Sequence, residues 1–291
     1  MYCTSPRRLR SFENTWELER LTATLSKTQV DRLGDRLREG AYGESEVRLL
    51  DEYRQSFREA YENVFRAIRE RGFEPTGRAA KSIVSIVEKL RRESIRLSQM
   101  QDMGGCRIVV TSELEQERSV SVLRVAFPQA TVVDRRENPS NGYRAVHVIA
   151  EESGKPIEIQ VRSSLQHLWA ELSEKASDVL DPMIKYGGGP PEMVTLLGGF
   201  SQKVMRCERL ERDLAELGSE IEFFEKKLAK GAMPDGLVGP SGQHRNKQLD
   251  GLRESVTKLN TILATKQAAI ADGLSQWISW LDKRRQAGEQ P

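Results

Sequence analysis

Four short β-branched segments in the middle of the chain, enclosed on both sides by longer helical patterns, constrain the fold most. The segments are rich in valine, isoleucine and threonine and end at turn residues. They cover residues 106–111, 131–134, 143–151 and 156–163. Ser153 and Gly154 separate the last two at the spacing of a β-hairpin. Helical patterns at 115–127 and 164–178 flank the segments, so we expect an α+β fold with a mixed sheet and flanking helices.

The N-terminal part of the chain is expected to be helical. Apolar residues recur at steps of three and four through residues 46–71, which predicts one amphipathic helix. Ser45 is the expected N-cap, and Gly72 is the expected stop. Residues 26–39 carry a shorter helical pattern. We therefore expect residues 1–71 to form an N-terminal helical segment.

A third helical pattern follows Gly77 and runs to about Arg96. Steps of three and four place four side chains on one face of this predicted helix, where cations can hold a polyphosphate. They are Arg78, Lys81, Ser85 and Lys89. The stretch from Arg71 to Arg96 is basic, a bias that a solvated helix face also produces.

Beyond residue 190 the pattern predicts two long helices joined by a Gly/Pro-rich break at 231–243. Their apolar seams are Leu210, Leu214, Leu217, Ile221, Phe224 and Leu228, then Leu252, Val256, Leu259, Leu263, Ile270, Leu274, Trp277 and Leu281. We expect an antiparallel hairpin over residues 191–291, whose apolar seams pack on each other, on the core or on another subunit. Trp277, Ile278, Trp280 and Leu281 are too close together to face one narrow seam. Some of them should dock on the core, on a second copy of the chain or on a regulatory partner.

Composition excludes several classes of protein. The 291 residues carry 45 Lys and Arg against 43 Asp and Glu, so net charge gives no argument for nucleic acid. The three cysteines, Cys3, Cys106 and Cys207, are widely spaced and odd in number, which predicts reduced thiols rather than a disulfide framework. The sequence has neither a secretory signal nor a stretch of apolar residues long enough for a membrane span. We therefore expect a cytoplasmic protein.

Polar side chains interrupt the last two predicted strands. Alternation places Tyr143 and His147 on one face of the first strand, and Glu158, Gln160 and Arg162 on one face of the second. A solvent-exposed sheet face has the same pattern. The presence of an aromatic ring, an imidazole, a carboxylate and a guanidinium on neighbouring strands instead favours a binding site.

Two carboxylates can share a metal ion. Asp102 lies just before a predicted strand, beside Gly104 and Gly105, which allow close backbone approach. Asp102 and Glu158 together could hold one Mg²⁺, which is typically bound by one or two carboxylates and by substrate phosphates.

Four motifs in order resemble one known family. The sequences GRAAKSIVSIVEKL, QDMGGCRIVV, NGYRAVH and EIQVR resemble the synthetase domain of the RelA/SpoT family, particularly its small single-function members. The resemblance covers roughly residues 45–190 and departs from the family in one extra residue between Arg78 and Lys81. It implies a nucleotidyltransferase-like core in residues 72–190. It also implies transfer of the β,γ-pyrophosphate of ATP to the 3′-hydroxyl of GDP or GTP, with release of AMP.

The resemblance also implies roles for individual residues. Asp102 and Glu158 would be the catalytic magnesium carboxylates, with Glu158 also activating the ribose hydroxyl. The ATP-binding residues would be Arg78, Lys81, Ser85, Lys89 and Arg107. The acceptor-binding residues would be Asn141, Tyr143, His147 and Gln160, with the Tyr143 ring stacked on the guanine.

Other functions stay open at this stage. Long relatives also carry a hydrolase domain built on an adjacent His-Asp pair, whereas His147, His167 and His244 are not followed by Asp, so we expect no hydrolase activity. Some relatives instead attach pyrophosphate to the 3′ end of tRNA, and Arg91, Arg92 and Arg96 would suit a phosphate backbone. A third reading is a non-catalytic nucleotide sensor or scaffold, against which the retention of both Asp102 and Glu158 argues.

Overall fold

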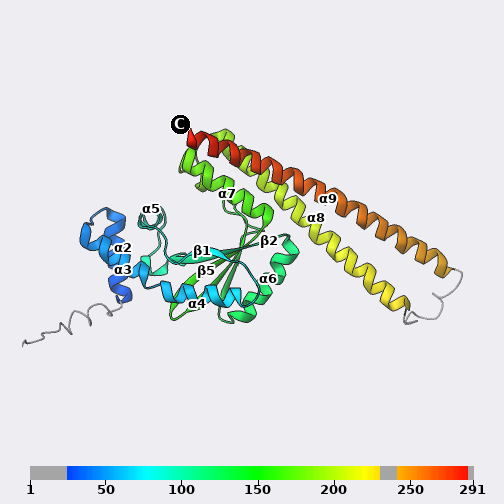
Figure 1. The fold of residues 1–291 in the computed structure, drawn as a ribbon, viewed down its shortest axis with the longest axis horizontal. Coiled ribbons are helices and arrows are strands. Elements are labelled where there is room, and N and C mark those ends of the chain that lie inside the picture. Colours follow the sequence, from blue (N-terminus) through cyan, green and yellow to red (C-terminus); the bar gives the residue numbers. More distant parts are fainter. Residues whose placement is uncertain (1–24, 230–240, 288–291) are drawn as a thin grey trace, which may run out of the picture.

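A mixed sheet surrounded by helices, with a long helical hairpin on one side, makes up the protein (Figure 1). The computed structural model describes residues 25–229 and 241–287. The helices are α2 (Lys27–Glu39), α3 (Glu44–Gln55), α4 (Arg58–Arg69), α5 (Ile83–Arg92), α6 (Glu113–Ala126), α7 (Ser164–Val179), α8 (Pro191–Ala229) and α9 (Ser241–Gln286), with short 3-10 turns η1 (Leu97–Gln99) and η2 (Ile184–Tyr186). The strands are β1 (Thr76–Arg78), β2 (Gly104–Val110), β3 (Thr131–Asp134), β4 (Val146–Glu152) and β5 (Lys155–Ser163).

The sheet has five strands in the order β1-β2-β5-β4-β3. Strands β2 and β5 are parallel, and every other neighbouring pair is antiparallel. The parallel register places Gly105 beside Glu158, and the β4–β5 hairpin places His147 opposite Gln160. The expected mixed sheet, its hairpin and the α+β class are confirmed.

Two hydrophobic cores lie on either side of the sheet's polar face. The first joins the N-terminal helices and α5 to the apolar face of the sheet, which α4 and α6 cover. Its largest fully buried side chains include Phe57, Ile86 and Ile108. The second core is formed by α7, α8 and α9, around Leu172 and Leu274. Because the two cores are separate, the polar face between them stays open.

The N-terminal helical pattern is interrupted. The single helix expected over residues 46–71 is two helices, α3 and α4, with a break at Ser56 and Phe57. The Ser56 hydroxyl donates a 2.6 Å hydrogen bond to the carbonyl of Tyr53, and such side-chain bonds compete with helical ones. The expected N-cap Ser45 is also wrong, because Gly43 holds that position and the carboxylate of Glu46 accepts from its amide.

The helix expected from residue 77 to about 96 is shorter. Ser82 is its N-cap, and its hydroxyl oxygen accepts from the amide of Ser85, so α5 begins at Ile83. The preceding residues form edge strand β1, which pairs with β2. The prediction of one helical face is therefore wrong for Arg78 and Lys81, which precede the helix.

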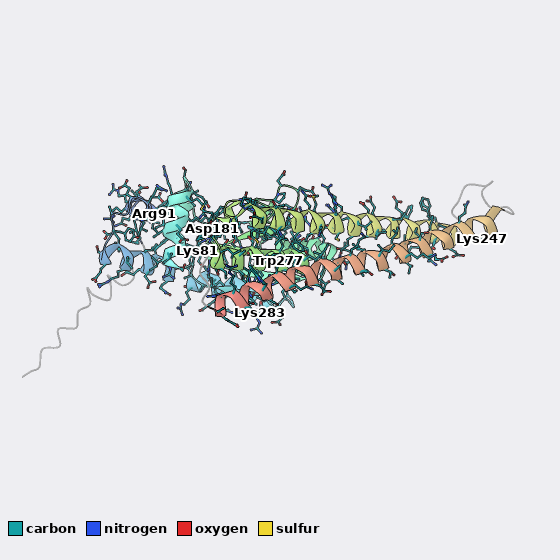
Figure 2. The ribbon with its side chains drawn as sticks, turned by 90° about the horizontal axis from the view of Figure 1, so that it is seen from above. Lys81, Arg91, Asp181, Lys247, Trp277 and Lys283 are labelled. Carbon is teal, nitrogen blue, oxygen red and sulfur yellow. The ribbon has the colours of Figure 1, made fainter. Side chains whose placement is uncertain are left out.

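The C-terminal helices form the expected antiparallel hairpin, and α9 packs against both α7 and α8 (Figure 1). The break at 231–243 falls largely outside the described residues, as does the side chain of Leu228. Figure 2 shows the hairpin running from Trp277 and Lys283, beside the core, to Lys247 at its far end. Along this length, burial of the seam changes from one end to the other.

At the base, Leu214, Ile221, Leu263, Leu274 and Leu281 are buried. Toward the far end the exposed large apolar side chains are Phe223, Phe224, Leu252, Leu259 and Ile262. The seam prediction is therefore wrong for Phe224, Leu252 and Leu259, since two helices alone cannot enclose them. In the described ranges no helix has the length and apolarity needed to cross a membrane.

The tryptophan-rich end of α9 contacts both α7 and α8, as the crowding of its large apolar side chains predicted. Ile278 and Leu281 are buried in the second core, which includes residues of α7 and α8. Trp280 keeps 42% of its surface exposed and contacts Trp277 edge to face at 5.5 Å between ring centroids. The core of the same chain thus receives most of this apolar surface.

Candidate active site

A cavity of about 750 Å³ opens over the polar face of the sheet, lined by α5 on one side and α7 on the other. All the predicted site residues except Arg107 line it, although they come from separate parts of the chain. They are Arg78, Lys81, Ser85, Lys89, Asp102, Asn141, Tyr143, His147, Glu158 and Gln160. A cavity of this size suits small-molecule ligands, and its few converging charged groups can orient them.

Asp102 lies between two lysines. The Lys81 ammonium donates to Oδ2 at 2.6 Å, and the Lys89 ammonium donates to Oδ1 at 2.8 Å. The amide of Lys81 also donates to the carbonyl of Met103, which fixes the segment before α5 against the start of β2. Burial alone would raise the pKa of Asp102, but the attraction of the two lysines outweighs it and lowers the pKa to about 2. The aspartate is therefore an anion at every physiological pH.

A closed ring of five polar side chains covers the sheet next to Asp102. The Tyr143 hydroxyl lies 2.9 Å from Nε2 of His147, whose Nδ1 lies 2.8 Å from a carboxylate oxygen of Glu158. The Gln160 amide donates to the other Glu158 oxygen at 2.6 Å, and Arg162 donates to both Gln160 and Tyr143. Each member has at least two partners, so the ring fixes the orientation of the Glu158 carboxylate.

Glu158 is held in its ionised form. Burial and the charge of Asp102 raise its pKa, whereas hydrogen bonds from His147 and Gln160 and the charge of His147 lower it, and the lowering effects dominate. Its position depends on a glycine in the neighbouring strand. A Cβ atom on Gly105 would lie 2.8 Å from the Glu158 carbonyl oxygen, so a larger residue would push the two strands apart.

The segment of residues 140–145, called here the acceptor loop after the role that the resemblance implies for Asn141 and Tyr143, brings these two residues to the cavity. Tyr143 was expected on a strand, but β4 begins only at Val146, so that strand boundary is wrong. The loop is folded by two left-handed residues, Asn141 at φ 51° and Gly142 at φ 88°. A Cβ on Gly142 would lie 2.8 Å from the Trp169 ring, so both its backbone and its surroundings require glycine.

Arg107 does not line the cavity. It lies beside Gln160 in the parallel register, and its Nε donates to the Thr76 hydroxyl at 3.0 Å. Its predicted role toward ATP stays a prediction.

Several side chains that line the cavity were not selected from the sequence. Arg162, within the EIQVR motif, closes the polar ring and is only 4% exposed. Arg92 of α5 lies 3.6 Å above the centre of the Tyr186 ring, which joins α5 to the turn after α7 across the rim of the cavity. Alternation already places Arg162 on the polar strand face, although no specific role was predicted for it, whereas Tyr186 lies in a glycine-rich segment that carries no periodic signal.

The carboxylates suit a magnesium ion that substrate phosphates complete. Asp102 and Glu158 both line the cavity, and the charge of Asp102 acts to raise the pKa of Glu158. No group of three or more His, Cys, Asp or Glu side chains in the described ranges is placed to hold a metal. Two carboxylates are nevertheless the usual protein contribution where Mg²⁺ also binds phosphate oxygens and water.

Comparison with known proteins identifies the family of this chain. Residues 77–177 match the region found in RelA / SpoT proteins. The GTP pyrophosphokinase YjbM of Bacillus subtilis is 30% identical over 170 residues, which cover 53% of this chain and 76% of that protein. The chain belongs to the RelA/SpoT family.

Other similar proteins are covered over very different shares of their own length. The uncharacterized protein Rv1366 of Mycobacterium tuberculosis is 36% identical over 118 residues, covering 39% of this chain and 43% of that protein. The matched region is thus less than half of that relative. The crystal structure of the small alarmone synthetase 1 from Bacillus subtilis is 25% identical, with a TM-score of 0.43, and covers 62% of this chain and 99% of that one.

Proposed function

We propose that this chain transfers the β,γ-pyrophosphate of ATP to the 3′-hydroxyl of GDP or GTP and releases AMP. One observation carries the proposal. A single cavity combines a cationic side, formed by Lys81 and Lys89, with a side formed by Tyr143 and Asn141, and both carboxylates face it. A phosphoryl donor and a nucleoside acceptor need such adjoining regions, because catalysis of their reaction is mainly positioning and charge neutralisation.

The chemistry assigned to the chain's own residues is proton removal and charge neutralisation. The acceptor 3′-oxygen forms a bond to the β-phosphorus of ATP, and the bond from that phosphorus to the α-phosphate oxygen breaks with its electron pair going to AMP. The hydroxyl proton passes to the carboxylate of Glu158, which is ionised and oriented by His147 and Gln160. When bound by Asp102 and Glu158, Mg²⁺ supplies further charge neutralisation on the phosphates.

Lys81 and Lys89 are expected to exchange partners during binding. In the structure both ammonium groups bind Asp102. Phosphate oxygens that enter the cavity offer them a second anion of similar geometry, and charge-assisted hydrogen bonds of this kind are the stronger class. The two lysines thus face the region of the cavity that the polyphosphate would enter.

Incubation of the purified protein with γ-labelled ATP and one acceptor at a time tests the proposal. We expect label on GDP or GTP with release of AMP, and none with Glu158→Gln, which keeps the size of the side chain but removes its charge. Label on deacylated tRNA alone would instead assign the chain to the tRNA-modifying relatives. Arg92 contacts Tyr186 at the rim, but Arg91 and Arg96 lie outside the cavity lining. No label on any acceptor, from folded protein that binds ATP, would favour the non-catalytic reading.

A further inference from the structure

The acceptor loop needs outside support to hold its conformation. Its two left-handed residues, Asn141 and Gly142, turn the chain, and inside the loop one backbone bond, from the Tyr143 amide to the Ser140 carbonyl, closes it. One such hydrogen bond contributes only modestly to stability, so a loop like this samples other conformations unless further contacts fix it. Bonds from His147 and Arg162 to the Tyr143 hydroxyl and from the Arg135 amide to the Ala145 carbonyl hold part of the loop, and the contacts to Gly142 and Arg144 come from the C-terminal hairpin.

Helix α8 contacts the loop on both sides of Tyr143. The Ser201 hydroxyl donates to the carbonyl of Gly142 at 2.7 Å. The Glu208 carboxylate accepts two bonds from Arg144, from Nε at 3.0 Å and from Nη2 at 2.7 Å. Ser201 and Glu208 are seven residues apart, which is about two helical turns, so they lie on one face of α8.

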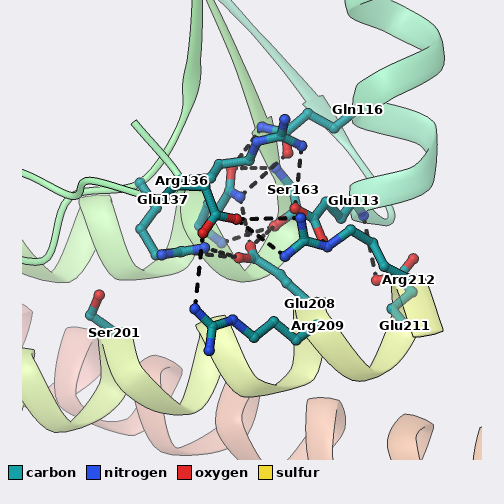
Figure 3. Close-up of polar contacts among 12 residues, drawn as sticks. Glu113, Gln116, Arg136, Glu137, Ser163, Ser201, Glu208, Arg209, Glu211 and Arg212 are labelled. Atoms are coloured by element: carbon teal, nitrogen blue, oxygen red, sulfur yellow. Dashed lines mark hydrogen bonds and ion pairs between the residues drawn. The ribbon is translucent and has the colours of Figure 1, made fainter. Parts of the chain in front are cut away.

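The contact between Glu208 and Arg144 is buried, and further partners fix the Glu208 carboxylate. Glu208 and Arg144 are each 3% exposed. The second oxygen of Glu208 accepts from the Gln166 amide at 2.6 Å, which leaves the carboxylate little freedom to turn. Figure 3 shows Glu208 reaching from α8 into a group of polar side chains. Removal of one charge from a buried pair leaves the other uncompensated, so Arg144 would be forced to move if Glu208 lost its charge.

The next turn of α8 reaches the chain just before the loop. Arg212 donates to a carboxylate oxygen of Glu137 at 3.3 Å (Figure 3). One helix thus contacts residues 137, 142 and 144 in succession. By contrast, the lysine side of the cavity is built from the β1–α5 segment, which packs on the N-terminal helices.

We propose that Ser201 and Glu208 are positioning residues of the acceptor site. They hold the acceptor loop so that Asn141 and Tyr143 face the cavity beside Glu158, which makes the base of the C-terminal hairpin part of acceptor recognition. The assignment of the acceptor side rests on the function proposed above. The two residues act through the loop backbone and through Arg144, and neither lines the cavity.

A positioning role and a merely structural role differ in what they change. Loss of positioning raises the KM for the acceptor and leaves the KM for ATP unchanged, because α8 does not contact the lysine side. Loss of general fold support lowers the active fraction and leaves both KM values as they were. The split between the two KM values therefore separates the roles.

Ser201→Ala and Glu208→Gln are measured by steady-state kinetics with each substrate varied in turn. We expect the acceptor KM to rise about fivefold for Ser201→Ala, which removes one hydrogen bond, and more for Glu208→Gln, with the ATP KM within twofold of wild type. Ser219→Ala and Glu216→Gln are matched controls on exposed positions of the same helix. The Ser219 hydroxyl bonds only within the helix, to the carbonyl of Ala215. Unchanged acceptor KM values, or equal changes for both substrates, would overturn the proposal.

Hydrogen exchange decides the same question without any substrate. We expect the amides of residues 140–145 to exchange faster in Ser201→Ala and Glu208→Gln than in wild type and in the two controls, while α5 stays as protected as before. Unchanged exchange in the loop, or equal acceleration throughout the core, would refute positioning by α8. If wild-type protein transfers no pyrophosphate, the proposed function fails, and the exchange data still give the answer for the loop.

Discussion

Glu113 lies at the start of α6 with its carboxylate buried among charged side chains from three elements (Figure 3). It is 1% exposed, and its oxygens lie 3.2 Å from Nη1 of Arg136 and 3.2 Å from Nε of Arg212. Burial and the nearby charge of Glu208 raise its pKa to about 7, against the lowering effect of the arginines. The folded protein therefore holds this proton more tightly than the unfolded chain does.

The sign of the pH dependence follows from that difference. Because the folded pKa is raised, the stabilising effect of the protonated carboxyl is complete below the unfolded pKa of 4.5 and disappears as pH rises through about 7. The shift from 4.5 to about 7 corresponds to a loss of about 2 kcal/mol in the free energy of unfolding between about pH 5 and pH 8. Glu113→Gln imitates the protonated form at every pH and avoids this loss.

Urea unfolding at several pH values tests the prediction. We expect the free energy of unfolding of Glu113→Gln to rise by about 2 kcal/mol relative to that of wild type as pH rises from about 5 to 8. The control is Glu117→Gln, which removes another carboxylate from Arg136, at 2.6 Å, but from a half-exposed position where charge contributes little. If both variants had the same pH dependence of unfolding, or if wild type became more stable relative to Glu113→Gln as pH rose, the burial of Glu113 would not be the cause of the pH dependence.

Three further substitutions examine the site. Asp102→Asn removes a magnesium carboxylate and should lower pyrophosphate transfer by more than a hundredfold in a folded protein, and a loss under tenfold, ~1.4 kcal/mol in barrier, would contradict that role. Tyr143→Ala should raise the acceptor KM by a factor equivalent to ~1–3 kcal/mol per stacked base, with little change in the KM for ATP. Tyr143→Phe is the control, because it keeps the ring. If Tyr143→Ala changed the KM for both substrates equally, the ring would only support the cavity. Gly142→Ala combines a positive φ with the approach to Trp169 and should destabilise by ~2 kcal/mol more than Gly154→Ala, which has positive φ but no neighbour within 4 Å, in thermal or urea unfolding. Equal effects of the two alanines would exclude the steric contact.

The sheet and most of its polar face could be predicted because their signals are local. Alternation of polar and apolar residues in residues 156–163 corresponds directly to the two faces of β5. The same rule failed at Tyr143, since alternation does not distinguish a strand from an extended loop that a glycine turns back.

The ends of the helices depend on hydrogen bonds and caps that hydrophobic periodicity does not predict. Apolar steps of three and four continue across Ser56, where the helix nevertheless breaks at a hydroxyl-to-backbone bond. Lys81 fits the pattern of α5 but precedes its cap at Ser82, and it reaches Asp102 from a loop.

The contacts by which α8 supports the acceptor loop could not be predicted from any sequence motif. Glu208 and Arg144 are 64 residues apart and belong to segments that read as an ordinary seam helix and as a polar strand. The packing of α8 against α6 and α7 brings them together, and a single sequence contains no sign of that packing.

The buried pair between Glu208 and Arg144 also sets the unit in which this protein unfolds. The boundary drawn at residue 190 by sequence pattern separates the core from helix α8, whose Glu208 carboxylate is buried against Arg144, so the hairpin base and the sheet are expected to unfold in one cooperative transition rather than in two. The far half of the hairpin, where Phe224 and Leu252 are exposed, has no such tie and is the part that should fray first. We therefore expect the cooperative unit to end partway along α8, so that the sheet and the base of the hairpin do not fold separately.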